Sequence, residues 1–363
     1  MKRPITLIAL SILLVFSTFA APKISFFVEL KGPEFQKLFA DTTLVSQLVK
    51  MKASLRVGLL DFSPERAQTI QKLNQAGIPV IAWLLLSEEE GYWFHMNNGD
   101  KAAQRYADFK KWTAENSLKW ERMGIDLELD FNDARLMVKH PFKLAWKAYK
   151  RLYDNKSLQK GREIYQKLIA QVQTDGYDVE SYVIPFIYDE RIAKTTSFQK
   201  LLGLVDIQTP NEIPMLYTSA MGKPSIIPAY HQKGQPVALG ITGGGVVIEG
   251  MRPRFMTWEE LSRDLLISNQ YSSEAIIFCL EATWENGWLS KIQTMDYTQT
   301  PPNLSLELKE QEKSRKAMQR ILVVLDHPFW MTVGLLILFA AMIFVIVKLI
   351  KLLYSVVKGK KIS

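Results

Sequence analysis

Three carboxylates alternate with apolar residues in the segment ERMGIDLELDFNDAR, residues 121–135. They are Asp126, Glu128 and Asp130. Because successive side chains of a β-strand point to opposite faces, the three acids share one face and the apolar residues occupy the other. Neighbouring carboxyl groups separate each other's pKa values, which is how pairs of acids perform proton-transfer chemistry. The acidic row is therefore the first candidate for a catalytic site.

The chemistry depends on what the acidic row faces. At the edge of an open sheet the acids would face water and their role would be structural. A closed barrel of parallel strands covers its outer face with helices, so the acids would point inward, with Asp130 nearest the C-terminal mouth where barrel active sites are found. The second interpretation is favoured because other polar side chains also stand near the ends of apolar runs: Glu29, Asp61, Tyr188, Asp189, Asp206, Thr242 and Glu281.

Short apolar runs alternate with helix-like segments through the middle of the chain. One such segment, residues 63–77, begins with Ser followed by Pro and ends in Gly, as helices commonly do. This alternation predicts a (β/α)8 TIM-type barrel of the α/β class. A doubly wound open sheet is the alternative, but no glycine-rich dinucleotide motif follows the first run. The expected strands are 24–30, 55–62, 78–86, 123–131, 181–189, 203–210, 236–244 and 274–282.

Both ends of the chain carry membrane-directed patterns. Residues 1–21 place Lys2 and Arg3 before an apolar run and small residues, which predicts a secretory signal peptide, with an uncleaved anchor as the alternative. The uncharged run 329–347 is long enough, as a helix, to cross a hydrocarbon core. Lysines follow that run, so the C-terminus is expected in the cytoplasm and the barrel outside, periplasmic or extracellular.

These patterns divide the chain into five expected parts. The part 298–328 combines a Pro-broken linker with a charged helical stalk, and the last part is a basic cytoplasmic tail. The expected boundaries are 1–21 for the signal peptide, 22–297 for the barrel, 298–328 for linker and stalk, 329–350 for a single transmembrane helix and 351–363 for the tail.

Charge and cysteine content exclude some classes of function. The formal net charge is +8, but the basic excess belongs to the two ends, and residues 22–300 carry as many acidic as basic side chains. Nucleic acid is therefore not an expected partner. The single cysteine, Cys279, excludes an internal disulfide and is expected to be a small buried residue.

The motif GIDLELD resembles the strand-four signature of the family 18 glycoside hydrolases, the chitinase-like barrels. Their pattern is Asp-Gly-x-Asp-x-Asp-x-Glu, in which the last Glu is the general acid. Here Gly124 and Asp126 match, Glu128 stands where the family has Asp, and Asp130 stands where it has the catalytic Glu. Met123 replaces the first Asp. The resemblance implies a divergent glycoside-hydrolase-like barrel.

Other family motifs are only partly represented. The Ser-x-Gly-Gly of strand three is missing from IPVIAWLLLSEEE. A Tyr-Asp pair occurs at Tyr188 and Asp189, but on the fifth expected strand rather than the sixth. Trp284, in CLEATWENGW, is the candidate counterpart of the strand-eight tryptophan. Asp130 is one methylene shorter than the Glu that it replaces, which keeps a non-catalytic relative as an alternative.

The expected chemistry is glycosidic cleavage by carboxylic acids. Asp130 would protonate the leaving oxygen, with its pKa raised by Glu128, and Asp126 would hold Glu128 in place. Tyr188, Asp189 or Glu281 would serve the other side of the sugar. Trp284 and Trp93 are candidate platforms for the sugar rings, although packing is the alternative role for each aromatic residue.

Three functions follow, in different classes. The first is a membrane-anchored glycosidase acting on an envelope or extracellular polysaccharide. The second is a non-catalytic barrel that binds a glycan or a protein at the membrane surface. The third is a hydrolase that uses the acidic row with Mg²⁺ or Ca²⁺. The four histidines have no metal-ligand spacing and no nucleotide-binding motif occurs, so no cofactor and no metal are expected; the lipid bilayer and a glycan are the expected partners.

Overall fold

The computed structural model describes residues 21–232, 234–251 and 253–359. Eight parallel strands form one sheet in the order β6-β5-β4-β3-β2-β1-β8-β7. The bounds of the strands are β1 Lys23–Val28, β2 Leu55–Leu59, β3 Val80–Leu84, β4 Arg122–Asp126, β5 Asp178–Val183, β6 Asn211–Pro214, β7 Val237–Gly240 and β8 Glu274–Phe278.

The sheet closes into a barrel. A parallel bridge between Met215, just after β6, and Ala238 of β7 joins the two ends of the strand order. Every other neighbouring pair is parallel as well, for example Trp83 of β3 with Gly124 of β4. The expected (β/α)8 architecture of the α/β class is therefore confirmed, and the open doubly wound sheet is excluded.

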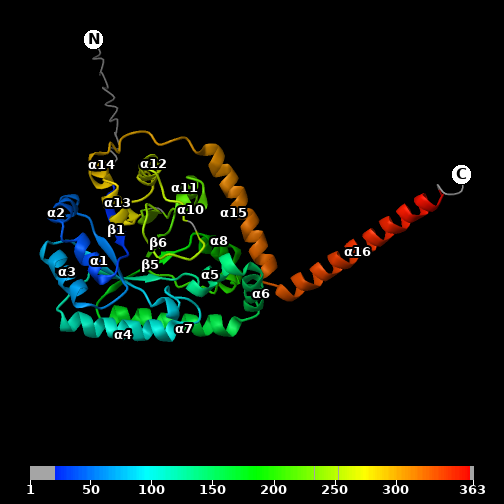
Figure 1. Ribbon diagram of the computed structural model, residues 1–363, viewed down its shortest axis with the longest axis horizontal. Helices are drawn as coiled ribbons and strands as arrows, with labels where there is room; N and C mark the ends of the chain where they lie inside the picture. Colours follow the sequence, from blue (N-terminus) through cyan, green and yellow to red (C-terminus); the bar gives the residue numbers. More distant parts are fainter. Residues whose placement is uncertain (1–20, 233, 252, 360–363) are drawn as a thin grey trace, which may run out of the picture.

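Helices surround the barrel, as Figure 1 shows. The bounds are α1 Gly32–Leu38, α2 Thr42–Met51, α3 Pro64–Gln75, α4 Gly99–Glu115, α5 Phe131–Lys139, α6 Pro141–Arg151, α7 Asn155–Thr174, α8 Phe186–Ala193, α9 Ser197–Leu202, α10 Thr218–Met221, α11 Ile226–Tyr230, α12 Trp258–Ser268, α13 Leu280–Glu285, α14 Trp288–Thr294, α15 Ser305–Leu325 and α16 Pro328–Gly359, with a 3-10 turn at Glu88–Glu90. Sequence signals set several helix starts: the Ser63 side chain accepts a hydrogen bond from Arg66 N, and Pro64 follows it.

The expected sixth strand at 203–210 is wrong, because β6 lies at Asn211–Pro214. Leu204, Val205 and Ile207 are buried, but they pack beneath helices rather than pairing with a strand. The apolar residues of 203–210 are therefore explained by their burial and do not indicate a strand. The fifth strand is also shorter than 181–189, and the chain beyond it turns into α8.

The lower part of the barrel interior is held by a buried ion-pair group. Arg56 of β2 donates to Glu180 of β5 and to Glu274 of β8, each at 2.9 Å. Above it Phe27, Trp83 and Tyr182 meet edge to face. Layers of side chains contributed by different strands are how such barrels are filled, so the lower and middle layers close the interior and leave only the mouth open.

α15 packs along the side of the barrel rather than standing free as a stalk (Figure 1). Arg315 Nε and Gln319 Nε2 donate to Asp189 Oδ1 on α8, both at 2.9 Å. Leu322 is buried against α8 and α9. α15 is therefore attached to the side of the barrel through α8 and α9.

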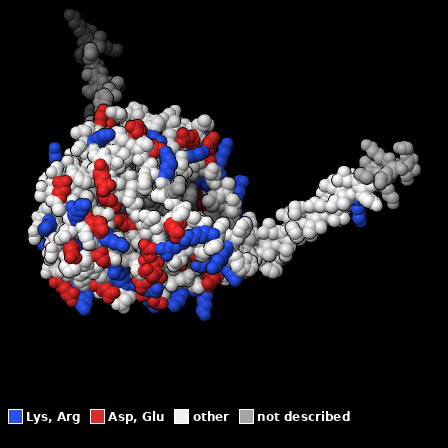
Figure 2. Space-filling view, viewed as in Figure 1, with Lys and Arg blue, Asp and Glu red and all other residues white. Residues whose placement is uncertain are grey.

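α16 projects away from the domain, and Figure 2 shows it almost free of charge beside the mixed acidic and basic surface of the barrel. Within the described residues, Pro328–Tyr354 is the one helix long and apolar enough to cross a membrane, with a mean hydropathy of 2.9. The expected signal peptide at 1–21 lies, but for its last residue, outside the described residues, and so does the end of the tail beyond 359.

Candidate active site

A pocket of about 440 Å³ opens at the C-terminal end of the barrel. The carboxyl groups of Glu29, Asp126 and Glu128 line it. The rest of the wall is mainly apolar and aromatic, and includes Trp83, Trp93, Tyr182, Tyr217, Phe278 and the segment 244–248 that follows β7. Three acids in one apolar pocket at the mouth of a barrel form the strongest candidate for an active site.

The end of β4 delivers two of the three acids to one face. Phe94 N donates to the Asp126 carbonyl and Glu128 N donates to the Phe94 carbonyl, both at 3.0 Å. This bridge keeps the backbone extended past the end of the strand, so Asp126 and Glu128 both line the pocket. Gly124 precedes them because a Cβ there would overlap the Tyr182 hydroxyl.

The surroundings of the three acids favour their protonated forms. Burial raises the pKa of Glu29 to about 8, with a further increase from the charge of Glu281. Burial raises the pKa of Glu128 to about 7. The pKa of Asp126 is raised well above its usual value, first by burial and then by the charges of Glu128 and Glu29. Burial among neighbouring acids thus raises the pKa of all three carboxyl groups.

Hydrogen bonds constrain these acids unevenly. The Tyr92 hydroxyl donates to Glu29 Oε1, which orients that carboxyl group. Asp126 Oδ1 and Trp83 Nε1 are both buried without a hydrogen bond of ordinary geometry, although the indole is near enough to lower the pKa of Asp126. An unpartnered polar atom at a pocket wall is free to bind a ligand.

Asp130 does not line the pocket; it begins the next helix. Its Oδ1 accepts from Asn132 N at 2.9 Å, which makes it the N-cap of α5. Its other oxygen lies 3.9 Å from Lys147 Nζ on α6. A residue in a cap has left the strand repeat, so the alternation expected over 126–130 ends at Glu128.

Two further candidates, Tyr188 and Asp189, lie on α8 and not at the end of a strand. Neither lines the pocket. Asp189 is fully buried and accepts from Tyr230 Oη at 2.5 Å, in addition to its bonds from α15. Its contacts are those of a residue that attaches α11 and α15 to the barrel.

The remaining candidates divide between wall and core. Trp93 lines the pocket. Glu281 lies just behind the wall, where its Oε1 accepts from Glu29 N at 3.3 Å, and burial raises its pKa. Trp284 is half-buried on α13 against the hydrophobic core and is outside the pocket lining.

The sequence analysis missed Tyr217 and understated Glu29. Tyr217 follows β6 and continues the inward alternation of Ile213 and Met215 toward the pocket. The misplaced sixth strand concealed that alternation. Glu29 was visible as a polar residue ending the first run, but nothing in one sequence indicates that this end meets the end of β4.

The loop after β7 passes close over the acids because it is rich in glycine. Gly244 has φ +68, and a Cβ there would approach Cys279 Sγ at 2.6 Å and Glu281 Oε1 at 2.9 Å. Gly245 has φ +83 and faces the ring of Phe278. Both glycines are required by conformation and by space, so this segment forms a closely fitted wall of the pocket.

No group of three or more His, Cys, Asp or Glu side chains suited to a metal ion occurs among the residues that the structure describes.

Comparisons with known proteins find distant similarity to solved structures only. No protein-family model and no curated protein sequence matches the chain. Similar solved structures include a GH18 chitinase from Pseudoalteromonas aurantia, at 11% identity and a TM-score of 0.44, covering 75% of this chain and 98% of that one. Saccharomyces cerevisiae Gas2p in complex with laminaritriose and laminaritetraose has 11% identity and a TM-score of 0.40, covering 80% and 67%.

A xylose isomerase domain protein from Planctomyces limnophilus is similar to the same degree, with 11% identity, a TM-score of 0.39 and coverage of 84% and 99%. Likeness at this level concerns the fold alone and carries no argument about activity. The class of the protein, a (β/α)8 barrel with acids at its mouth, rests on its own strand order and pocket.

Proposed function

We propose that the chain is a membrane-anchored glycoside hydrolase that acts on an envelope or extracellular polysaccharide, with Glu128 as the proton donor. The observation that carries the proposal is the cluster of Glu29, Asp126 and Glu128, three carboxyl groups with raised pKa values in one pocket at the barrel mouth. Glycosidic cleavage needs one carboxyl group that is protonated near neutral pH and a second that stabilises or attacks the anomeric carbon.

In the proposed reaction Glu128 gives its proton to the glycosidic oxygen while the bond from that oxygen to the anomeric carbon breaks. The leaving sugar departs as an alcohol. A water molecule then adds to the anomeric carbon, and its proton returns to the Glu128 carboxylate. A pKa of about 7 suits both steps, because the group is protonated at the start and basic enough to recover the proton.

Glu128 is a better donor than Asp130, the residue that the family resemblance implies. Asp130 is engaged as the cap of α5, lies near Lys147 and does not line the pocket. Glu128 lines the pocket and is surrounded by other acids instead. Tyr217 stands at the end of the sixth strand, where the resembled family carries its tyrosine, and it replaces Tyr188 in the proposal.

Sugar binding would use the aromatic wall. Trp93, Tyr217 and Phe278 line the pocket around the acids and present flat faces of the kind that sugar rings stack on. Asp126 Oδ1, which forms no hydrogen bond of ordinary geometry with the residues that the structure describes, would accept from a sugar hydroxyl or share the proton of Glu128.

The membrane part of the proposal places α16 across the bilayer as a single span. Its length, composition and exposed side chains support this assignment. The expected signal peptide and the lysines that follow the span support an orientation with the barrel on the outer side and the C-terminus in the cytoplasm.

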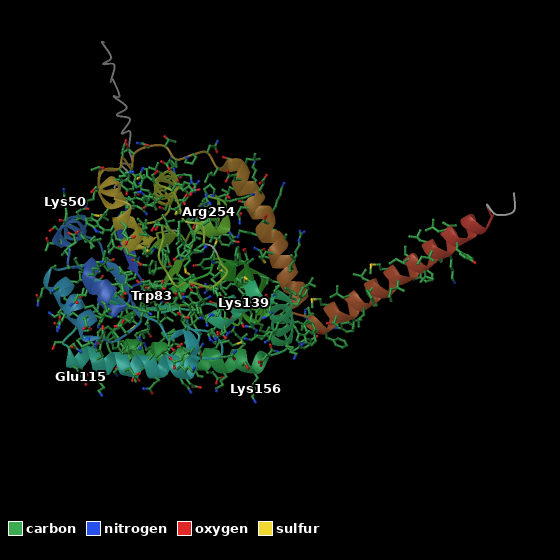
Figure 3. The ribbon with its side chains drawn as sticks, in the orientation of Figure 1. Lys50, Trp83, Glu115, Lys139, Lys156 and Arg254 are labelled. Atoms are coloured by element: carbon green, nitrogen blue, oxygen red, sulfur yellow. The ribbon has the colours of Figure 1, made fainter. Side chains whose placement is uncertain are left out.

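The test is turnover on a panel of envelope polysaccharides by the full chain and by Glu128→Gln. The matched control is Glu115→Gln, an exposed carboxylate on α4 that Figure 3 labels at the outer edge of the domain, away from Trp83 in its interior. Loss of turnover in the first variant alone supports the proposal. A parent protein that binds glycans and cleaves none would replace it with the binding-only barrel.

A further inference from the structure

α6 presents a stripe of aromatic side chains to solvent. Phe142, Trp146 and Tyr149 are spaced four and three residues apart, so they lie on one face of the helix, and Tyr153 continues the stripe just beyond its end. Phe142 is 90% exposed and Trp146 is 58% exposed. Trp146 stacks on Tyr149 with ring centroids 5.5 Å apart. Large aromatic residues gathered on a water-facing helix mark an interaction surface.

The opposite face of α6 is fixed to the barrel. Lys147 Nζ and Arg151 Nη2 each lie 2.5 Å from a carboxylate oxygen of Asp133 on α5. Leu152, at the end of the helix, is buried. These contacts fix the rotation of α6 about its axis. The aromatic stripe on the other face is therefore held toward solvent.

The stripe begins where the apolar helix leaves the domain. The hydroxyl groups of Tyr149 and Thr332, in the second turn of α16, lie 2.9 Å apart. Figure 1 shows α6 beside the root of α16. Phe329 and Trp330 at the start of α16 are also exposed. The aromatic stripe and the candidate membrane span therefore form one continuous surface.

α6 itself carries basic side chains and no acidic one, although exposed Glu249 pairs with Lys139 just before the helix. The sequence 139–151, KHPFKLAWKAYKR, contains no acidic residue. Lys139, Lys143 and Lys150 are exposed, and Lys150 lies over the ring of Trp146 at 5.2 Å. A basic amphipathic helix with exposed Trp and Phe is the type of helix that lies in a membrane interface, and its lysines strengthen binding to an anionic surface.

We propose that α6 lies in the headgroup layer of an anionic bilayer, with Phe142 and Trp146 inserted, immediately beside the point where α16 enters. The inference rests on the membrane span of the proposed function and goes beyond it by fixing the orientation of the barrel. α5, which holds α6, also supplies Ala134 and Met137 to the pocket wall. The pocket is therefore held near the bilayer surface, where it would receive glycans attached to or lying on the membrane.

The experiment places a fluorescent label at single cysteines in the full chain. Cys279 is the only native cysteine and is buried, so it leaves the labelling specific. The variants are Phe142→Cys, Leu338→Cys in α16, and Leu306→Cys as the control. Leu306 is 74% exposed at the start of α15, whose 21 residues separate it by about 30 Å from the root of α16.

Each labelled protein is reconstituted in bilayers of phosphatidylcholine with phosphatidylglycerol, with and without lipids that carry a quenching nitroxide. We expect blue-shifted, quenched emission at positions 142 and 338 and an aqueous, unquenched label at 306. Omitting phosphatidylglycerol should weaken quenching at 142 and leave 338 unchanged, because only α6 depends on anionic charge.

The outcomes separate the inference from the proposed function. Quenching at 338 without quenching at 142 overturns the membrane-docked α6 and leaves the anchor standing. An aqueous label at 338 removes the anchor and the inference together. Equal quenching at 142 and 306 shows non-specific adhesion of the whole domain, which also overturns the inference.

Discussion

The carboxylates on the two sides of the junction between β4 and α5 have opposite surroundings. Asp126 and Glu128, before the junction, meet other acids in an apolar pocket, and burial raises the pKa of both. Asp130 and Asp133, after it, meet Lys147, and Asp133 meets Arg151 as well. Residues of the same type, a few positions apart, thus form a proton-holding site and an ion-paired clamp. The partner that the fold supplies decides which role a carboxylate takes.

The largest expected effect is the loss of turnover when an acid of the pocket, Glu128, is replaced. Glu128→Gln preserves size but cannot deliver a proton, and loss of a general acid costs about 10²–10⁴ in rate. The measurement is kcat on a cleaved polysaccharide beside the melting temperature. Retained turnover in this variant would show that Glu128 is not the proton donor. The pocket acids would then differ from Asp130 and Asp133 in their surroundings but not in a catalytic role.

The next effect concerns the clamp. Asp133→Ala leaves Lys147 and the buried guanidinium of Arg151 without their shared partner, and breaking a buried ion pair typically costs about 3–5 kcal/mol. Chemical unfolding should show a loss at the low end, since Lys147 is partly exposed. The control is Asp100→Asn, whose exposed pair with Lys160 should change stability by less than about 1 kcal/mol. Equal effects of the two variants would contradict the clamp.

Asp189 on α8 is a third kind of carboxylate, because its partners Arg315 and Gln319 lie far along the chain on α15. A fragment of residues 21–301 lacks Arg315 and Gln319, whereas a fragment of residues 21–326 keeps both. A buried acceptor that loses donors costs about 1–3 kcal/mol, and more when it is charged; Asp189 keeps the donor Tyr230 in both fragments. We expect the longer fragment to be more stable in urea by at least that amount, because it also keeps Leu322 buried against α8 and α9. Equal midpoints would mean that α15 contributes no stability to the barrel.

The pocket acids also predict how stability depends on pH. The pKa values of Glu29, about 8, and Glu128, about 7, exceed the unfolded value of about 4.3. The folded chain therefore holds extra protons between about pH 4.3 and 8, and its free energy of unfolding falls as the pH rises through this interval. Melting temperatures at a series of pH values should decline accordingly, and Glu29→Gln with Glu128→Gln should flatten the decline. A rise in stability over the same interval would contradict the raised pKa values.

The smallest effect is expected at Asp130. Asp130→Ala removes the cap of α5 and should cost about 1 kcal/mol, as loss of an N-cap side chain does. Asp130→Asn, which can still cap, should cost less and leave turnover unchanged. Loss of turnover in Asp130→Asn with the fold intact would return the role of proton donor to Asp130.

Several features could be predicted from the sequence because they depend on local spacing. The alternation of apolar runs with capped helices predicts the parallel barrel, and Ser63 followed by Pro64 marks the start of α3. The uncharged run after residue 328 predicts a helix that can span a bilayer. Periodicity and capping involve residues within a few positions of one another, so one sequence contains all the information needed.

Only the tertiary structure decided which acids meet. The sequence placed Asp126, Glu128 and Asp130 on one face, but the chain leaves the extended conformation after Glu128, and Asp130 becomes a helix cap. Glu29 reaches the same pocket from the end of β1, the first strand of the chain, and Tyr217 reaches it from the segment after β6. Proximity between residues so distant in the chain depends on barrel closure, and no local pattern encodes it. For the same reason the pKa of a carboxyl group could not be read from its neighbours in sequence, since burial and the charges across the barrel set it.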